Sequence, residues 1–298
     1  MSRNKMHADE VDISPELIRS LLLKQFPQWA DLTLRVMQPE GTDNAMYKLG
    51  NDKLVRLPRT EGSSLNIEKE IACLPKLGPQ LPIPIPKIIG KGMPDSGYPF
   101  PWLVCDFLEG SNPDKEGMID EDMAAADLGA FVKAMQKIQP VNGPKCRRGT
   151  PLSNRSKEVK QFIPLLNEIY DEELLRKLWD SASRAPIWSK DPVWIHGDLH
   201  AGNLLAKDKK IVGVVDFGLA GIGDPACDMM VAWALLSSKN REIFRSIVQP
   251  DDDTWHRGRG WALFLGIVGY PYYRDTNPIF ARIAKRALDE AIADWKGH

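Results

Sequence analysis

Two short segments near residue 200 carry the side chains best suited to chemistry. The first runs from Trp194 to Asn203 and places His196, Asp198 and Asn203 so that the Asn follows the Asp by five residues. The second, Val-Val-Asp-Phe-Gly, carries Asp216 behind a β-branched apolar pair. Phosphoryl transfer needs one carboxylate to orient an attacking hydroxyl and accept its proton, and it needs oxygen ligands for Mg²⁺ on the nucleotide phosphates. Asp198 suits the first role, and Asn203 with Asp216 suits the second.

The spacing of these motifs is more specific than any one of them. His-x-Asp or Asp-Phe-Gly alone is also typical of a turn between two strands. In this order, His-x-Asp-x-x-x-x-Asn followed by Asp-Phe-Gly is the spacing of a kinase catalytic loop and its metal-binding aspartate. Between them we expect a hairpin, with strands at 203–206 and 211–215 and a turn at 207–210. That hairpin brings Asn203 and Asp216 to the same end, which a shared Mg²⁺ requires.

The catalytic segment also carries a family resemblance. His-Gly-Asp-Leu-His-Ala-Gly-Asn from His196, together with Asp-Phe-Gly at 216–218, resembles the aminoglycoside phosphotransferase family. Members of that family are small-molecule kinases with a fold like that of eukaryotic protein kinases. The similarity continues through Gly-Asp-Pro at 223–225 to Asp228, and weaker similarity extends from about Thr42 to the last helices, so that it covers most of the chain. It is specific to the superfamily and does not specify the substrate.

Four residues in or near the catalytic segment are expected to have a structural role or no role in the chemistry. By the resemblance, His196 holds the loop through hydrogen bonds and transfers no proton, and Asp228 braces the loop. Asp224 followed by proline is typical of the cap and first turn of a helix. His200 has no assigned chemistry, and we expect it to face solvent.

A candidate nucleotide site begins in a loop of the first third of the chain. Residues 40–45, Glu-Gly-Thr-Asp-Asn-Ala, contain one glycine where the protein-kinase loop has three, but they resemble the shorter loop of the phosphotransferase family. Thr42 and Asn44 are therefore candidates for contacts to phosphate oxygens. An ordinary polar hairpin turn is the alternative interpretation.

Two further places complete the candidate nucleotide site. Arg56 stands where kinases have a phosphate-binding Lys, and a guanidinium binds phosphate oxygens through two donors. By the resemblance its helix partner is Glu70, with Glu68 as a rival; a surface Arg is the alternative. Residues 103–110 resemble the hinge between lobes, where backbone groups of Asp106 and Leu108 would meet the purine. This stretch does not separate ATP from GTP as the donor.

The order of expected elements predicts an α+β fold with two lobes, like that of protein kinases. The first third is rich in strands, with a leading helix capped at Ser14 and a second helix at 64–74, ended by the proline that follows. The polar segment 110–117 marks the boundary, so we expect a nucleotide-binding lobe at 1–109 and a helical lobe with the catalytic loop and substrate pocket at 110–298. Helical patterns follow at about 123–138, 157–183 with a break at Pro164, 225–237, 253–269 and 277–295.

The composition is typical of a globular protein and excludes several other classes. Hydrophobic residues make up 43% and charged residues 27%, and the net charge of -1 gives no pull toward nucleic acid or acidic membranes. The four dispersed cysteines form no C-x-x-C and predict reduced thiols in a cytosolic protein. The N-terminus lacks the apolar region of a signal peptide, and no apolar run is long enough to cross a bilayer. We therefore expect a cytoplasmic protein without nucleic-acid or membrane partners.

The acceptor is expected to be a hydroxyl of a small molecule and not of a protein. Only residues 219–223 separate Asp-Phe-Gly from the next helix start, whereas a protein kinase needs a long activation segment ending in Ala-Pro-Glu. Acidic residues at 251–294 suit an aminoglycoside, and aromatic residues at 233–273 suit a less polar antibiotic such as a macrolide, unless both sets serve packing and solvation.

Two other functions stay open at this point. One is a metabolic kinase for a sugar, a choline-like compound or an amino alcohol, which would use the same catalytic residues. The other is a nucleotide-binding pseudokinase that scaffolds a partner. A pseudokinase is expected to have lost its base or a metal ligand, but Asp198, Asn203 and Asp216 are all present.

Overall fold

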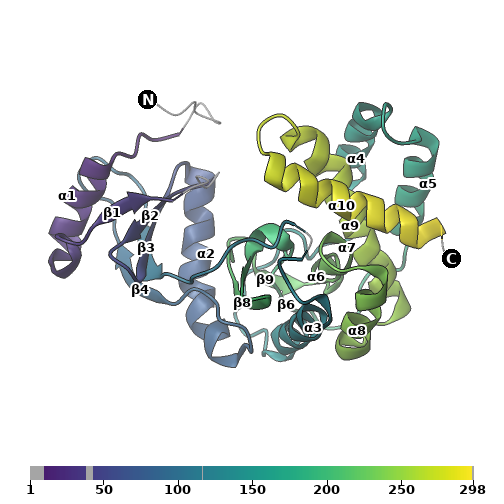
Figure 1. The fold of residues 1–298 in the computed structure, drawn as a ribbon, viewed down its shortest axis with the longest axis horizontal. Helices are drawn as coiled ribbons and strands as arrows, with labels where there is room; N and C mark the ends of the chain where they lie inside the picture. Colours follow the sequence, from purple (N-terminus) through teal and green to yellow (C-terminus); the bar gives the residue numbers. More distant parts are fainter. Residues whose placement is uncertain (1–9, 38–42, 116, 297–298) are drawn as a thin grey trace. The chain divides into compact units, whose positions relative to one another are not determined.

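The computed structural model of the protein divides into two compact units (Figure 1). The described parts of Met1–Pro79 and Ile85–Leu108 make the first unit, and those of Gln80–Pro84 and Glu109–His298 make the second. The first unit is built on a sheet and the second is mainly helical. Every helix in the described part is too short or too polar to span a bilayer. The described part comprises residues 10–37, 43–115 and 117–296.

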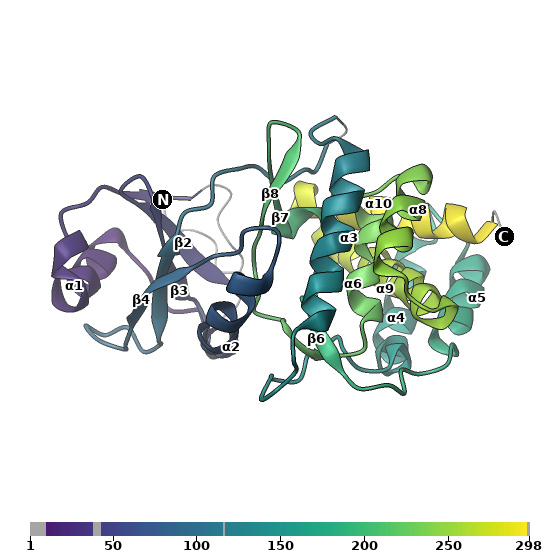
Figure 2. The same ribbon diagram turned by 90° about the horizontal axis from the view of Figure 1, so that it is seen from below.

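The first unit contains α1 (Pro15–Gln25), β1 (Leu34–Val36), β2 (Asn44–Leu49), β3 (Lys53–Pro58), α2 (Glu61–Leu77), β4 (Ile88–Gly92) and β5 (Trp102–Asp106), with 3₁₀ turns at Pro27–Trp29 and Gly78–Gln80. Its strands form one antiparallel sheet in the order β1-β2-β3-β5-β4. Figure 2 shows β2, β3 and β4 of this sheet. Successive side chains of a strand point to opposite faces. Trp102 and Val104 accordingly pack in a cluster with α1, whereas Leu103 and Cys105 pack in a cluster with α2. Burial on both faces explains the apolar run Trp102–Cys105 in β5.

Capping hydrogen bonds set where the two helices of the first unit begin. Ser14 accepts a hydrogen bond from Leu17 N (3.2 Å), which confirms the predicted start of α1. The prediction for α2 was wrong at both ends. Thr60 accepts from Ser63 N (3.2 Å) and starts the helix earlier, and Pro75 lies inside its last turn. Only two residues follow that proline, so the backbone hydrogen bond that it removes lies in the last turn of the helix.

The second unit contains α3 (Glu121–Lys137), α4 (Ser156–Phe162), α5 (Glu172–Ser183), β6 (Val193–Ile195), β7 (Leu204–Lys207), β8 (Lys210–Val214), β9 (Gly221–Gly223), α6 (Ala226–Met229), α7 (Val231–Ala234), α8 (Ser238–Val248), α9 (Asp252–Tyr273) and α10 (Pro278–Lys296), with 3₁₀ turns at Leu152–Arg155, Ile163–Leu166 and Ala201–Asn203. The predicted break at Pro164 is confirmed, because it lies in the 3₁₀ turn after α4. Helices α9 and α10 approach closely, since a Cβ at Gly266 would lie 2.4 Å from the Leu288 Cβ.

Strands β7 and β8 form the predicted hairpin between the two catalytic motifs. Asp208 and Lys209 at its turn have φ values of 51° and 63°, and positive φ at both central residues is what a tight two-residue hairpin turn requires. Val215 N donates to Asn203 O (2.9 Å), so the residues just before β7 and just after β8 are neighbours. The second unit also takes in the proline-rich segment 80–84, because Val214 N donates to Pro84 O (3.0 Å).

All four cysteines are buried free thiols, and no disulfide joins them. Cys73 lies in α2 and Cys105 in β5, within the first unit. Cys146 and Cys227 lie in the second unit, in the segment after α3 and in α6. Each thiol is therefore part of the packed interior of one unit.

Candidate active site

One buried carboxylate holds the backbone of the catalytic loop, which we define as residues 196–203. Asp228 of α6 accepts hydrogen bonds from His196 N (2.7 Å) and Gly197 N (2.8 Å). Burial raises the pKa of this carboxyl, although His196 and the two N–H groups oppose the rise. Gly197 has a φ of 80°, and a Cβ there would lie 2.7 Å from the Cys146 Sγ, so the loop needs glycine at this position. These contacts fit the bracing role predicted for Asp228.

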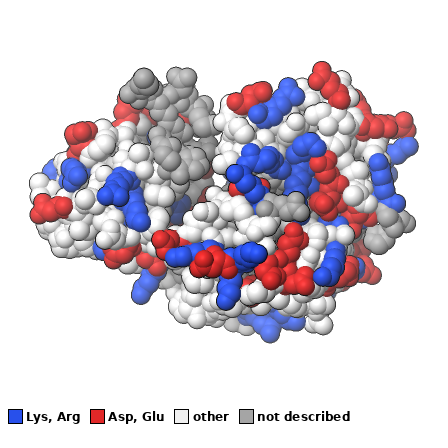
Figure 3. Space-filling view, viewed as in Figure 1, with Lys and Arg blue, Asp and Glu red and all other residues white. Residues whose placement is uncertain are grey.

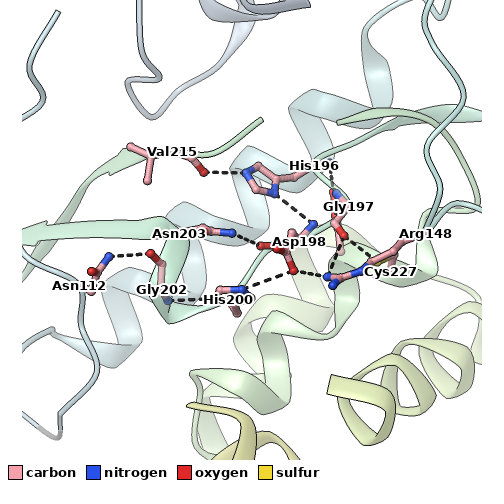
Figure 4. Close-up of polar contacts among 11 residues, drawn as sticks. Asn112, Arg148, His196, Gly197, Asp198, His200, Gly202, Asn203, Val215 and Cys227 are labelled. Atoms are coloured by element: carbon pink, nitrogen blue, oxygen red, sulfur yellow. Dashed lines mark hydrogen bonds and ion pairs between the residues drawn. The ribbon is translucent and has the colours of Figure 1, made fainter. Parts of the chain in front are cut away.

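His196 joins the catalytic loop to the end of the β7–β8 hairpin (Figure 4). Its fully buried ring accepts a hydrogen bond at Nδ1 from Asp198 N (3.2 Å), and its Nε2 lies 3.0 Å from Val215 O. Because Nδ1 accepts, the ring proton belongs on Nε2, which donates to the carbonyl. The ring also packs at an angle of 66° against Phe217. Both nitrogens are used inside the protein, an arrangement suited to the predicted supporting role.

Asp198 is the carboxylate at the centre of this network, and two cationic or polar groups contact its Oδ1 (Figure 4). Arg148 Nη1 donates to Oδ1, and His200 Nε2 lies 3.4 Å from the same atom. The side chain of Asp198 is 19% exposed. Burial would raise its pKa, but Arg148, His200 and His196 outweigh burial and lower the pKa well below the usual range. Asp198 is therefore ionised, the form in which a carboxylate can accept a proton.

The prediction that His200 faces solvent was wrong, because its side chain is only 3% exposed. Its Nδ1 accepts a hydrogen bond from Gly202 N (3.1 Å) and so begins the 3₁₀ turn that leads to β7. The ring packs edge-on against Phe280 of α10, with centroids 5.2 Å apart. With Nδ1 as acceptor, Nε2 carries the proton beside Asp198.

The hairpin brings the two predicted metal ligands, Asn203 and Asp216, to one end, as the Val215–Asn203 hydrogen bond shows. Asn203 Nδ2 donates to Asp198 O (2.8 Å), which leaves Oδ1 as the available atom of the amide. Within the described residues, neither Asn203 Oδ1 nor the Asp216 carboxylate receives a hydrogen bond. Oxygen atoms of this kind fit Mg²⁺.

The protein supplies only part of a metal coordination shell. In the ranges that the structure describes, no three His, Cys, Asp or Glu side chains gather to hold a metal ion. Mg²⁺ prefers six oxygen ligands and usually keeps waters or binds substrate phosphates beside one or two protein ligands. Asn203 and Asp216 are therefore suited to hold Mg²⁺ as part of a complex with nucleotide.

In the first unit, Arg56 and Glu70 form a buried ion pair. The Arg56 guanidinium donates to both oxygens of Glu70, through Nη1 to Oε2 and through Nη2 to Oε1 (3.2 Å). Arg56 is 7% and Glu70 is 1% exposed, so the surface alternative for Arg56 is wrong. Glu68, the rival partner, is exposed on α2. Contact of this pair with nucleotide stays a prediction.

The remaining candidates for nucleotide binding lie in the same unit. Thr42 falls outside the described residues, and Asn44 is the first residue of β2. Asp106 N donates to Lys87 O (3.0 Å), so the carbonyl is the backbone group of Asp106 that a purine could use. The backbone of Leu108 has no hydrogen-bond partner within the described residues, which leaves its N–H available.

Sequence reasoning missed Arg148, which lies in the segment predicted only as a loop at 140–151. It contacts a residue that is fifty positions away in the chain. No spacing in the sequence connects residue 148 with residue 198, and the flanking Cys-Arg-Arg-Gly-Thr-Pro is typical of an ordinary turn. Tertiary structure alone reveals the contact.

A catalytic loop with these contacts, leading through a hairpin to Asp-Phe-Gly, defines a kinase-type phosphotransferase fold. Comparison with known families agrees: residues 38–261 match the model of the phosphotransferase enzyme family, and the chain belongs to this family. An aminoglycoside 3'-phosphotransferase of Escherichia coli is 40% identical over 60 residues, which are 20% of this chain and 22% of that protein. A second from the same organism is 23% identical over 126 residues, 41% of this chain and 46% of that protein. The chain thus aligns with less than half of the length of these curated relatives.

Solved structures resemble the chain over nearly its whole length. The GDP complex of an aminoglycoside 2'-phosphotransferase-IIIa variant has a TM-score of 0.72 at 21% identity, covering 95% of this chain and 99% of that one. A macrolide 2'-phosphotransferase from Brachybacterium faecium has a TM-score of 0.61 at 21% identity, covering 92% and 97%. At these identities the likeness concerns the fold, and it confirms the predicted two-lobed α+β class.

Proposed function

We propose that the protein transfers the γ-phosphate of ATP or GTP to a hydroxyl group of a small molecule. The observation that carries this proposal is the placement of Asp198, a partly exposed carboxylate that Arg148 contacts and whose backbone carbonyl accepts from Asn203 Nδ2 (2.8 Å). Against the effect of burial, Arg148 and His200 also hold its pKa below the usual range. The acceptor oxygen attacks the γ-phosphorus while the bond from that phosphorus to the β–γ bridging oxygen breaks. The hydroxyl proton passes to Asp198, and the nucleoside diphosphate leaves.

The chain's own residues position the reactants for this step. Asp228 and His196 fix the backbone around Asp198, so the carboxylate needs little reorganisation. Asn203 and Asp216 would hold Mg²⁺, which neutralises charge on the β- and γ-phosphate oxygens when bound. Arg56, oriented by Glu70, is the proposed contact to the nucleotide phosphates.

A small acceptor is favoured over a protein by the segment after Asp-Phe-Gly. Strand β9 begins at Gly221 and pairs directly with β6, and Asp224 then accepts from Ala226 N (2.9 Å) at the first residue of α6. The predicted cap at Asp224 is one residue early, because Pro225 is the N-cap of α6. The short connection leaves no activation segment on which an extended peptide would lie. Aminoglycoside and macrolide phosphotransferases, whose names state their acceptors, have the same fold.

A cavity of about 420 Å³ in the second unit has the size of a small-molecule site. Its lining includes Ala201 of the catalytic loop, the segment around Asp114 and the face of α10 that carries Arg282 and Glu290. Both signs of charge line it, so the cavity does not by itself favour a polycationic acceptor. On the face seen in Figure 3, basic side chains likewise lie among acidic ones, and no single-sign stripe suited to nucleic acid is seen there.

The aromatic residues of the second unit divide between packing and the surface. Trp233 and Trp261 are 0% and 1% exposed and belong to the interior. Tyr272 is 53% exposed and packs edge-on against Tyr273 near the end of α9. The tryptophans therefore support the packing interpretation, and the tyrosines are the better candidates for contact with an acceptor.

The test is a screen for phosphate transfer with MgATP and MgGTP as separate donors. The panel contains kanamycin, gentamicin, streptomycin, macrolides, sugars, choline and amino alcohols, with casein as a protein acceptor. We expect at least one small molecule to stimulate nucleoside diphosphate release and to gain phosphate by mass spectrometry, and Asp198→Asn to lower both signals by about 10²- to 10⁴-fold. Efficient phosphorylation of casein beside an inert small-molecule panel would contradict the proposal.

A further inference from the structure

The two oxygens of the Asp198 carboxylate have different surroundings. Oδ1 receives Arg148 Nη1 and lies 3.4 Å from His200 Nε2. Within the described residues no donor reaches Oδ2. A carboxylate with one oxygen bound to cationic or polar groups and the other free has a defined orientation. The free oxygen is the one available to an incoming hydroxyl.

Arg148 reaches Asp198 from a segment that is fixed on both sides. Before it, Cys146 N donates to Ile222 O (3.0 Å), and after it, Asp224 N donates to Gly149 O (3.0 Å). A Cβ on Gly149 would lie 2.8 Å from the Gly223 Cα, so the two backbones cross in close contact. The segment is thus attached to β9 and its flank, and the guanidinium projects from a rigid base.

We propose that Arg148 is a positioning residue for phosphate transfer: it holds Oδ1 of Asp198 so that Oδ2 faces the acceptor hydroxyl and takes its proton. This inference rests on the proposed function, in which Asp198 is the base. The proton moves from the acceptor oxygen to Oδ2 as the oxygen–phosphorus bond forms. Arg148 itself forms and breaks no covalent bond.

A second ion pair in the same unit, between Arg257 and Asp224, has a structural role and differs from the pair of Arg148 and Asp198. Arg257 and Asp224 are 3% and 5% exposed at their side chains, and Arg257 contacts both oxygens of that carboxylate. Arg148 and Asp198 are 22% and 19% exposed, and only one oxygen of Asp198 is used. The Arg257 pair is closed on all sides, whereas the Arg148 pair leaves one carboxylate oxygen open to a substrate.

The test compares Arg148→Ala and Arg148→Lys with the neighbouring Arg147→Ala. Arg147 is exposed, and its side chain makes no contact recorded in the described part of the chain. We expect Arg148→Ala to lower kcat by about 10- to 100-fold, the size of effect that misplacing a reacting group produces. KM for the nucleotide should stay within about twofold of the wild-type value, because only the chemical step is affected. Arg148→Lys should keep part of kcat, and Arg147→Ala should equal wild type.

Two further measurements separate positioning from general support of the fold. Guanidinium or methylguanidinium ions should restore part of the kcat of Arg148→Ala, with no effect on Arg147→Ala. In the Asp198→Asn background, Arg148→Ala should cause no additional loss of turnover, since the carboxylate that Arg148 orients is gone. If Arg148→Ala fails to fold, as judged by its Tm, Arg148→Lys is compared with wild type and with Asp198→Asn in the same way.

Turnover is measured with the best acceptor of the panel, or as hydrolysis of MgATP or MgGTP by water if none is used. A wild-type kcat in Arg148→Ala and Arg148→Lys, beside a strongly lowered kcat in Asp198→Asn, overturns this inference and leaves the proposed function intact. An additive loss in the double mutant overturns it too. A fully active Asp198→Asn overturns the proposed function itself.

Discussion

Asp198 combines two properties that a general base needs, a negative charge and an unoccupied oxygen. Replacing it with Asn keeps the shape and removes the proposed proton acceptor. We expect Asp198→Asn to lower kcat by about 10²- to 10⁴-fold, the usual contribution of a positioned base. Affinity for the nucleotide, measured by calorimetry with a non-hydrolysable analogue, should stay close to wild type. A large loss of nucleotide affinity would mean that Asp198 acts through the metal and not on the acceptor.

Asp216 should affect binding as well as turnover. We expect Asp216→Ala to weaken binding of the Mg-nucleotide complex strongly, while binding of the same nucleotide in EDTA changes little, because the carboxylate acts through the cation. Asn203→Ala should have the same pattern with a smaller loss, since an amide oxygen carries no net charge. If chelation of Mg²⁺ leaves wild-type binding and turnover unchanged, the metal assignment is wrong.

At the scale of the element, the start of α9 has a helix cap whose contribution to stability can be measured. Asp251 accepts a hydrogen bond from Thr254 N (2.8 Å) and pairs with Lys190 Nζ (2.8 Å). We expect Asp251→Ala to lower the free energy of unfolding by about 1 kcal/mol, and Asp251→Asn to lower it less, because Asn caps helices as well as Asp does. Denaturant titration near neutral pH measures both values. Equal losses in the two variants would show that the charge, and not the cap, stabilises this end.

The same residue gives the cap a pH dependence. Burial would raise the pKa of Asp251, but Lys190 and Thr254 lower it to about 2. An unfolded Asp titrates near about 3.9, so the ionic contribution is present above that pH and is lost as the pH falls toward 2. The side chain is 42% exposed, so this contribution is small, as it is for surface pairs. Wild type and Asp251→Asn should therefore converge in stability as the pH falls below about 4.

Local patterns in the sequence predicted the elements whose cause is local. The cap at Ser14, the break at Pro164 and the β7–β8 hairpin each depend on a few adjacent residues, and all three are confirmed. Strand β4 was not predicted, since it contains two glycines and a lysine and is held by pairing with β5. Helix α8 was also missed because its buried positions include Asn240 and Arg241, which break the apolar period.

The residues of the candidate site likewise differ in whether their placement depends on local sequence or on long-range packing. Candidates with fixed spacing, such as Asp198, Asn203 and Asp216, could be named from the sequence because the catalytic loop and hairpin are continuous, and their chemical roles stay predictions. His200 was misplaced, since its burial depends on Phe280 of a distant helix. Arg148 was missed because its contact with Asp198 depends on how a loop attaches to β9. Long-range packing decides such positions, and no short window of sequence records it.

At the scale of the molecule, the four buried thiols allow the unfolding of each unit to be measured separately, because each unit contains two of them. Burial raises the pKa of Cys105 to about 12 and that of Cys146 to about 11, and it also raises the pKa values of Cys73 and Cys227. A buried, protonated thiol reacts slowly with alkylating reagents. We expect the native protein to show almost no titratable thiol with a chromogenic disulfide and to show four after denaturation. Rapid modification of the native protein would contradict the buried placement.

Isotope-coded alkylation at increasing denaturant, followed by peptide mapping, would then show the denaturant concentration at which each cysteine becomes exposed. Modification of Cys73 and Cys105 reports the loss of the sheet-based unit, and modification of Cys146 and Cys227 reports the loss of the helical unit. Local opening precedes global unfolding when units differ in stability. The native cysteines thus serve as reporters, without any mutation, of which of the two units unfolds first.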